Sequence, residues 1–290
     1  MIKTLHLLYE QIPKSLERIL LSLCFLFCLT SIQGQSADSL AHALADKAEE
    51  FNNKESLPYL EEAFNLCAEL GCADSTIARL YQRKSVTYYL GFSEFNTSLL
   101  YTDSAIYYYQ LAYGQNNLIT ANSYFNKGAI QTSIGRYSEA KKSIEDAINF
   151  LNANEELDHK DSIWVNWSYE LMRVNRRSGD FNTALKLGKS ILRSKSLFPL
   201  AESRTKILIG GILLDQLRYS EAKTLYSMYL KEPKFSTSKV IRGNLGLAYL
   251  ALGEISLAEP LLLENYNYRF DQHKSEAVSY THLTLPTIYS

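Results

Sequence analysis

The chain has 290 residues, of which 46% are hydrophobic and 21% are charged, a composition that excludes a mostly disordered protein. Its 30 Lys and Arg residues balance its 31 Asp and Glu residues, so the net charge of −1 gives no field that attracts nucleic acid or an acidic membrane surface. Four cysteines are too few for a disulfide-built scaffold, whereas 21 Tyr and 12 Phe must supply much of the core.

Residues 1–34 have the features of a signal peptide. Lys14 and Arg18 precede an apolar run from Ile19 to Leu29, which polar residues follow. This run is too short to cross about 30 Å of hydrocarbon as an ordinary membrane helix, but it fits the apolar segment of a secretory signal. The sequence therefore predicts an exported protein of the periplasm or cell surface. An uncleaved anchor formed by residues 19–33 is the alternative, and no other membrane segment is expected.

A six-residue pattern recurs through the body of the chain. The sequence Arg136–Lys141 returns unchanged as Arg218–Lys223, and related copies begin at Glu94, Asp180 and Glu254. In three copies a glycine stands two residues before a bulky one, and it permits chain reversal after a helix. The bulky residue fills the turn, and a small residue three positions later lets the next helix approach closely. The pattern predicts repeated helix–turn–helix hairpins.

Small residues set the register of these hairpins. One small residue in each expected second helix recurs at intervals of 36 to 44 residues: Ser56, Ser98, Ala140, Ala184, Ala222 and Ala258. Further residues expected to pack the two helices of a hairpin together are Gly128, Gly135, Tyr137, Gly246 and Gly253.

These positions resemble the tetratricopeptide repeat (TPR) family, whose unit is a helical hairpin of about 34 residues. The best copy reads Tyr124, Gly128, Gly135, Tyr137, Ala140, Ile144 and Ala147. The longer intervals resemble the long-repeat variant seen in kinesin light chains and in many bacterial proteins. The resemblance implies an all-α, right-handed α-solenoid of about six repeats over residues 35–277, with a continuous core and the first helices lining a concave face.

The last residues, 278–290, carry no charge and show no helical period. They resemble the translation of a sequencing-library adaptor. We therefore expect an artefactual, disordered tail, and a native chain that is truncated near Ala277.

Motifs for catalysis or metal binding are missing from the sequence. There is no nucleophile elbow, glycine-rich phosphate loop, His-Glu-x-x-His or Cys/His cluster. We expect no catalytic residue, no metal site and no cofactor, and this fragment is not expected to be an enzyme. Cys67 and Cys72 lie five residues apart near an expected helix end, where a disulfide and two buried thiols are both open.

Binding is the function that repeats of this type favour. In the fourth hairpin, one helical stripe carries residues at spacings of three and four: Asn166, Tyr169, Arg173 and Arg176. Neighbouring first helices add Arg83, Asn122, Phe125 and Arg204. This cationic, aromatic-flanked stripe suits a protein or extended peptide, acidic ones included. The alternative is an ordinary solvated face.

The sequence therefore favours a non-catalytic protein–protein interaction scaffold. A leader followed by long repeats also resembles the N-terminal region of bacterial proteins that end in a caspase-like CHAT peptidase domain, or of others that end in a sensor kinase. That resemblance implies the alternative function, a sensing or regulatory arm of a larger enzyme or signal transducer.

Overall fold

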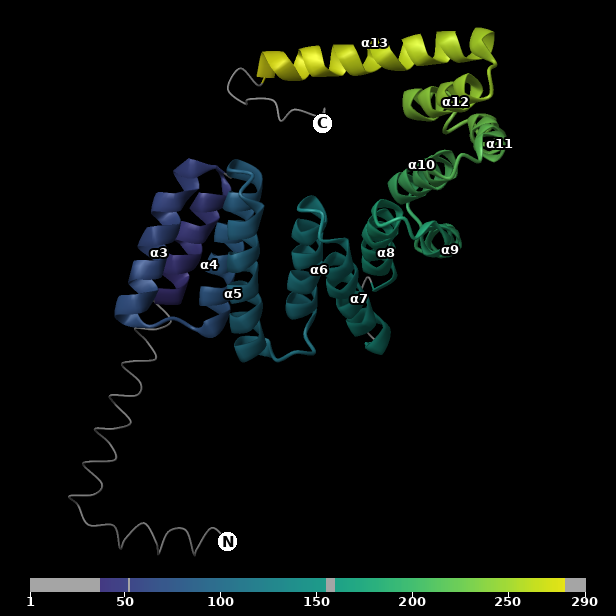
Figure 1. The fold of residues 1–290 in the computed structure, drawn as a ribbon. Helices are drawn as coiled ribbons and strands as arrows, with labels where there is room; N and C mark the ends of the chain where they lie inside the picture. The colour runs from purple at the N-terminus through teal and green to yellow at the C-terminus, as the bar shows by residue number, and fades with distance from the viewer. Residues whose placement is uncertain (1–36, 52, 155–159, 280–290) are drawn as a thin grey trace, which may run out of the picture. The chain divides into compact units, whose positions relative to one another are not determined.

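The computed structural model describes residues 37–51, 53–154 and 160–279, with side chains described up to Arg269. All regular secondary structure in these residues is helical (Figure 1). The helices are, in chain order, residues 37–49, η1 (Lys54–Ser56), α3 (Leu57–Leu70), α4 (Asp74–Val86), the π-helical turn η2 (Thr87–Gly91), α5 (Phe95–Tyr113), α6 (Leu118–Ser133), α7 (Tyr137–Ala153), α8 (Lys160–Arg177), α9 (Phe181–Leu192), α10 (Pro199–Asp215), α11 (Tyr219–Leu230), α12 (Lys239–Ala251) and α13 (Ile255–Ser279).

The predicted leader lies outside the described residues, and so does the predicted tail, apart from its first two residues, which extend α13 to Ser279. Within the described ranges, no helix has the length and apolar character needed to cross a membrane.

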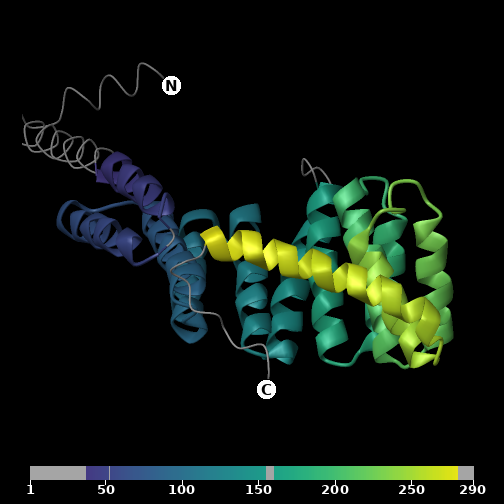
Figure 2. The ribbon, with the colours of Figure 1, turned by 90° about the horizontal axis from the view of Figure 1, so that it is seen from above.

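The chain divides into two compact units, with the boundary between Phe150 and Leu151, inside α7. In unit 1, which ends at Phe150, α4 packs on α5 and α5 on α6. In unit 2, which begins at Leu151, the pairs α8–α9, α10–α11 and α12–α13 are joined by contacts of α9 with α10 and of α11 with α12 (Figure 2). The predicted all-α architecture of stacked helix–turn–helix hairpins is therefore confirmed.

The tight turns inside four hairpins share one geometry. Gly135, Gly179 and Gly253 have φ values of 78°, 81° and 76° and end the first helix of their hairpins. In each turn the next amide donates to the carbonyl five residues earlier, as from Arg136 to Gln131 at 2.9 Å. This is the Schellman arrangement, which satisfies helix-end carbonyls through a residue with positive φ. Leu217 takes the same place between α10 and α11 with φ of 60°, without a glycine.

The register residues of the second helices are all in the interior: the exposed fraction is 1% for Ala258 and 0% for Ser56, Ser98, Ala140, Ala184 and Ala222. Glycines of the first helices face side chains that lie one turn further along the second helices. A Cβ atom on Gly128 would lie 2.5 Å from Ile144 Cγ1, and one on Gly246 would lie 3.0 Å from Leu262 Cγ. The first helix thus rests directly on the second at both places, because a longer side chain has no room. Tyr137 is half-buried at the start of α7.

The interior of unit 1 is partly polar. Where later repeats have alanine, Ser98 has a hydroxyl that hydrogen-bonds Ser85 Oγ at 2.9 Å and the Ser85 carbonyl at 2.8 Å. Thr102 Oγ1 lies 2.6 Å from Ser85 Oγ, and the Ser56 and Thr87 hydroxyls pair at 2.9 Å. Because buried polar groups need partners, these mutual hydrogen bonds explain how serine replaces alanine at two register positions.

The two cysteines that follow the leader form a disulfide in the structure. Cys67 lies in the last turn of α3 and Cys72 follows Gly71, the residue that ends this helix. The bond therefore ties the end of α3 to the segment that leads into α4. The spacing of the two cysteines in the sequence allowed either a disulfide or two buried thiols, and the structure has the disulfide.

Candidate functional site

Unit 2 contains a cavity of about 560 Å³ between α8 and α10, the first helices of two successive hairpins. We call it the arginine groove. It is lined by Tyr169, Arg173, Arg176, Arg177, Arg204, Ile207, Leu208 and Asp215. Four of these residues are ones that the sequence analysis singled out on the expected first helices, namely Tyr169, Arg173, Arg176 and Arg204.

Two of the four arginines are held by carboxylates. Arg173 Nη1 donates to Glu170 Oε2 at 2.7 Å, one turn earlier on α8. Arg176 crosses to α10, where its Nε and Nη2 donate to the two carboxylate oxygens of Asp215 at 2.5 and 3.1 Å. The hydrogen bond to Asp215 raises the pKa of Arg176 above its ordinary value. Gly211 leaves space for this guanidinium, because a Cβ atom there would lie 3.0 Å from Arg176 Nη1.

The other two arginines are not neutralised. Arg177 and Arg204 are exposed, and in the part of the chain that the structure describes neither has a carboxylate or hydrogen-bond partner. With Glu170 and Asp215 set against four guanidinium groups, the groove retains two positive charges. Guanidinium groups bind carboxylates and phosphates bidentately, so the groove is chemically suited to an anionic ligand.

Tyr169 adds a neutral donor to the groove. Its ring is half-buried, and its hydroxyl has no hydrogen-bond partner among the described residues. Burial raises the pKa of Tyr169, although the nearby charge of Arg173 acts in the opposite direction. The hydroxyl therefore stays protonated at neutral pH and can donate a hydrogen bond to a ligand.

The other residues proposed from sequence occupy separate positions. Asn166 is exposed on α8, one turn before Tyr169, and does not line the groove. Arg83 lies in unit 1, where it forms an ion pair with Glu49. Asn122 is exposed and Phe125 is half-buried on α6, also in unit 1. None of the last three lines either of the two cavities that lie among the described residues of that unit.

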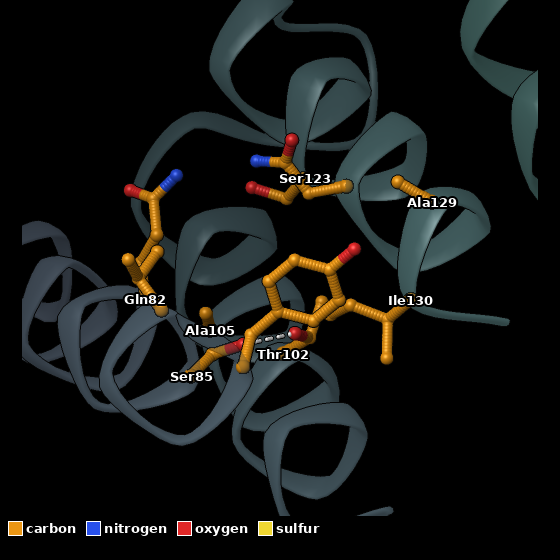
Figure 3. Close-up of a pocket in the computed structure, with 10 residues that line it drawn as sticks. Gln82, Ser85, Thr102, Ala105, Ser123, Ala129 and Ile130 are labelled. Carbon is orange, nitrogen blue, oxygen red and sulfur yellow. Dashed lines mark hydrogen bonds between the residues drawn. The ribbon is translucent and has the colours of Figure 1, made fainter. Parts of the chain in front are cut away.

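One of the two, of about 140 Å³, lies between α4, α5 and α6 (Figure 3). We call it the unit 1 pocket. It is lined by Gln82, Ser85, Val86, Tyr89, Thr102, Ala105, Ser123, Asn126, Ala129 and Ile130. Sequence reasoning did not single out any of these residues, because they carry no charge and form no motif. Gln82 and Asn126 are the immediate neighbours in sequence of Arg83 and Phe125. The sequence therefore indicated the two helices that form this pocket, but not the helix faces that line it.

Neither the arginine groove nor the unit 1 pocket resembles a metal centre. Among residues 37–51, 53–154 and 160–279, no group of three or more His, Cys, Asp or Glu side chains is placed to hold a metal ion.

Comparisons with known proteins show the fold. No protein-family model and no curated protein sequence matches the chain. Among solved structures, the apo form of the quorum sensor NprR from B. thuringiensis is similar at a TM-score of 0.60 and 15% identity, over 86% of this chain and 72% of that one. NprR in complex with its cognate peptide NprX gives a TM-score of 0.54 at 15% identity, over 87% and 74%.

Pseudomonas aeruginosa PilF gives a TM-score of 0.53 at 14% identity, over 81% of this chain and 99% of that one. These neighbours are TPR-repeat proteins, and at such low identity the likeness concerns the fold alone. The chain therefore has the fold of a TPR-type helical solenoid.

Proposed function

We propose that this protein is an interaction scaffold that binds an extended, acidic segment of another polypeptide in the arginine groove. The observation that carries the proposal is the pair of unneutralised guanidinium groups, Arg177 and Arg204, in a cavity of about 560 Å³. Ile207 and Leu208 give the same cavity an apolar surface, which can contact the aliphatic parts of the side chains of a bound peptide.

The paired arginines support this proposal in a different way. Arg173 and Arg176 are held by Glu170 and Asp215, so they form a fixed wall and lose little side-chain freedom when a ligand arrives. Arg177 and Arg204 then supply the charge-assisted hydrogen bonds that select a carboxylate. The peptide complex of NprR, a protein with a similar fold, makes a peptide a reasonable ligand class for this groove.

Binding of a labelled oligoglutamate peptide, measured by fluorescence anisotropy, tests the proposal. The double variant Arg177→Glu/Arg204→Glu should weaken binding by at least about tenfold, since hydrogen bonds to charged groups contribute about 1.5–3 kcal/mol and about 1.4 kcal/mol is tenfold in affinity. Arg173 and Arg176 are poorer choices for this test, because their reversal would also set a new carboxylate against Glu170 or Asp215.

The matched control is Arg193→Glu/Lys195→Glu, which makes the same change of charge at two exposed cations of unit 2 that do not line the groove. This control should bind oligoglutamate nearly as the parent chain does. An equal loss in both double variants would mean that net charge alone attracts the peptide. Equal binding of an oligoglutamine peptide would also refute the proposal.

We further propose that the protein is exported. The charged and apolar pattern of residues 1–34 supports this, and so does the disulfide between Cys67 and Cys72, because such bonds persist in oxidising compartments. Mass spectrometry of the protein from a cell-envelope fraction should find an N-terminus near Gln35 and no free thiol at either cysteine. An intact leader on a protein recovered from the cytoplasm with both thiols reduced would contradict export.

A further inference from the structure

The unit 1 pocket has the size of a small-molecule or side-chain site. It lies between first helices α4 and α6 and is closed by α5, as the labelled residues of Figure 3 show. Its volume of about 140 Å³ is close to that of an engineered apolar cavity of about 150 Å³ that takes up benzene. The space exists because Ala105 and Ala129 contribute only methyl groups to the wall, where Val86 and Ile130 supply larger apolar surface.

Most polar groups around this space already have partners. Ser85 and Thr102 hydrogen-bond each other at 2.6 Å, as Figure 3 marks, and Thr102 also bonds the Ser98 carbonyl at 3.0 Å. Ser123 donates to the Ile119 carbonyl at 3.0 Å. These hydroxyls are therefore part of the fold rather than open to a ligand.

Two carboxamides are different. Gln82 accepts a hydrogen bond from the Tyr109 hydroxyl at 2.7 Å through Oε1, which leaves the Nε2 donors of Gln82 unused. The Asn126 side chain, on α6, has no hydrogen-bond partner in the described part of the chain. One carboxamide from each of two first helices is thus half-buried beside the apolar space with bonding capacity left over.

We propose that the unit 1 pocket binds a branched aliphatic side chain, of about leucine size, from an uncharged extended peptide. Gln82 Nε2 donates to a carbonyl of that peptide, and Asn126 pairs through its amide and its oxygen with a backbone peptide group. A carboxamide matches a peptide group because each has one carbonyl acceptor and an N–H donor. The proposal does not depend on the arginine groove, which lies in the other unit.

The residues that line the unit 1 pocket also determine which side chains it excludes. Every residue that lines it is uncharged, so an acidic or basic side chain would lose its water without gaining an ion-pair partner. The two cavities therefore differ in selectivity: the arginine groove takes anionic segments, and the unit 1 pocket takes neutral, aliphatic ones.

NMR titration of the full chain tests this proposal with N-acetyl-leucine methylamide, N-acetyl-aspartate methylamide and benzene as probes. The leucine probe should give saturable shifts of the side-chain amides of Gln82 and Asn126 and of the Ala129 backbone amide, and the aspartate probe should give none. Failure of the leucine probe to saturate would overturn the proposal. Benzene binding as tightly as the leucine probe would reduce the pocket to an apolar void, which also overturns it.

Two variants test the two parts of the site. Asn126→Ala should weaken binding of the leucine probe by about fivefold, the effect of one net hydrogen bond, whereas Asn116→Ala, in an exposed loop, should not. Ala129→Leu should fill the space and abolish binding, whereas Ala112→Leu, on the exposed side of α5, should not. Unchanged binding in Asn126→Ala would refute the role of the carboxamide even if Ala129→Leu did not fold.

Discussion

Replacing Gly210 with alanine should lower the free energy of unfolding by about 2 kcal/mol, although alanine is the better helix former by about 1 kcal/mol. A Cβ atom on Gly210 would lie 2.2 Å from Tyr226 Cζ and 2.5 Å from its hydroxyl oxygen. Tyr226 cannot move aside, because it is completely buried and its hydroxyl donates to the Ile207 carbonyl at 3.0 Å. The same hydroxyl accepts from Asn244 Nδ2 at 3.1 Å.

The neighbouring glycine is the control for this prediction. The three heavy atoms nearest to a Cβ atom on Gly211 all belong to the guanidinium of Arg176, the nearest at 3.0 Å, and the end of a partly exposed side chain can give by the few tenths of an ångström that this requires. Gly211→Ala should therefore change stability by less than about 0.5 kcal/mol or raise it. Urea unfolding followed by circular dichroism measures both variants. If the Gly210→Ala variant were as stable as the Gly211→Ala variant, this result would contradict the close contact between α10 and α11 at Gly210.

Replacing Lys206 with methionine should cost about 2 kcal/mol of unfolding free energy. Lys206 is 8% exposed, and its Nζ lies 2.9 Å from Glu202 Oε1 and 2.6 Å from Glu232 Oε1. The ammonium group also lies 4.8 Å from the ring centroids of Tyr229 and Phe235. Methionine keeps the packing of the stem but leaves two carboxylates near apolar surface without their most buried cation. Breaking a buried ion pair costs about 3–5 kcal/mol, and the partial exposure of Glu232 reduces that figure.

Lys234→Met is the matched control. Lys234 Nζ also contacts both carboxylates, at 2.6 and 3.8 Å, but its side chain is 50% exposed. Exposed ion pairs contribute about 0–1 kcal/mol, so this variant should lose less than about half as much as Lys206→Met. Equal losses in thermal or urea unfolding would show that burial of Lys206 does not decide the effect.

The pH dependence of this cluster has a definite sign. The hydrogen bond from Lys234, and then that from Lys206, lowers the pKa of Glu202 below its usual value. A carboxylate with a lowered pKa stabilises the fold at neutral pH, and this stabilisation is lost as the pH falls through the pKa of the folded state. The stability difference between Lys206→Met and the parent chain should therefore shrink in acid.

The hairpins could be predicted because their signals are local. Gly135, Gly179 and Gly253 indicate turns with a positive φ. A bulky residue and a small residue follow each of them at the same spacing in the sequence. Leu217 carries no such signal, and the turn there was located only because the hexapeptide from Arg218 repeats an earlier one. The disulfide could not be decided from spacing, since both states of Cys67 and Cys72 fit a helix end.

The arginine groove was predictable only in part. Tyr169, Arg173 and Arg176 share one face of α8, so helical spacing alone brings them together. Arg177 follows Arg173 by four residues and lies at the edge of the same face, where it lines the cavity, but the predicted stripe ended at Arg176. The pairing of Arg176 with Asp215 joins two helices across 39 residues, and no local pattern contains that information.

The unit 1 pocket could not be predicted at all. Its volume is the space that the small side chains of Ala105 and Ala129 leave unfilled once α4, α5 and α6 have packed together. Small residues in a helical repeat usually indicate close packing, and the sequence does not show which of them leave a space.

Photo-crosslinking of an oligoglutamate peptide that carries a diazirine group, mapped by mass spectrometry, tests the central claim that the arginine groove captures acidic polypeptide. We expect the crosslinks to fall within α8 and α10, near Arg177 and Arg204, and to disappear in the Arg177→Glu/Arg204→Glu variant. Crosslinks that fall elsewhere, with residues 160–177 and 199–215 unlabelled, would contradict this account.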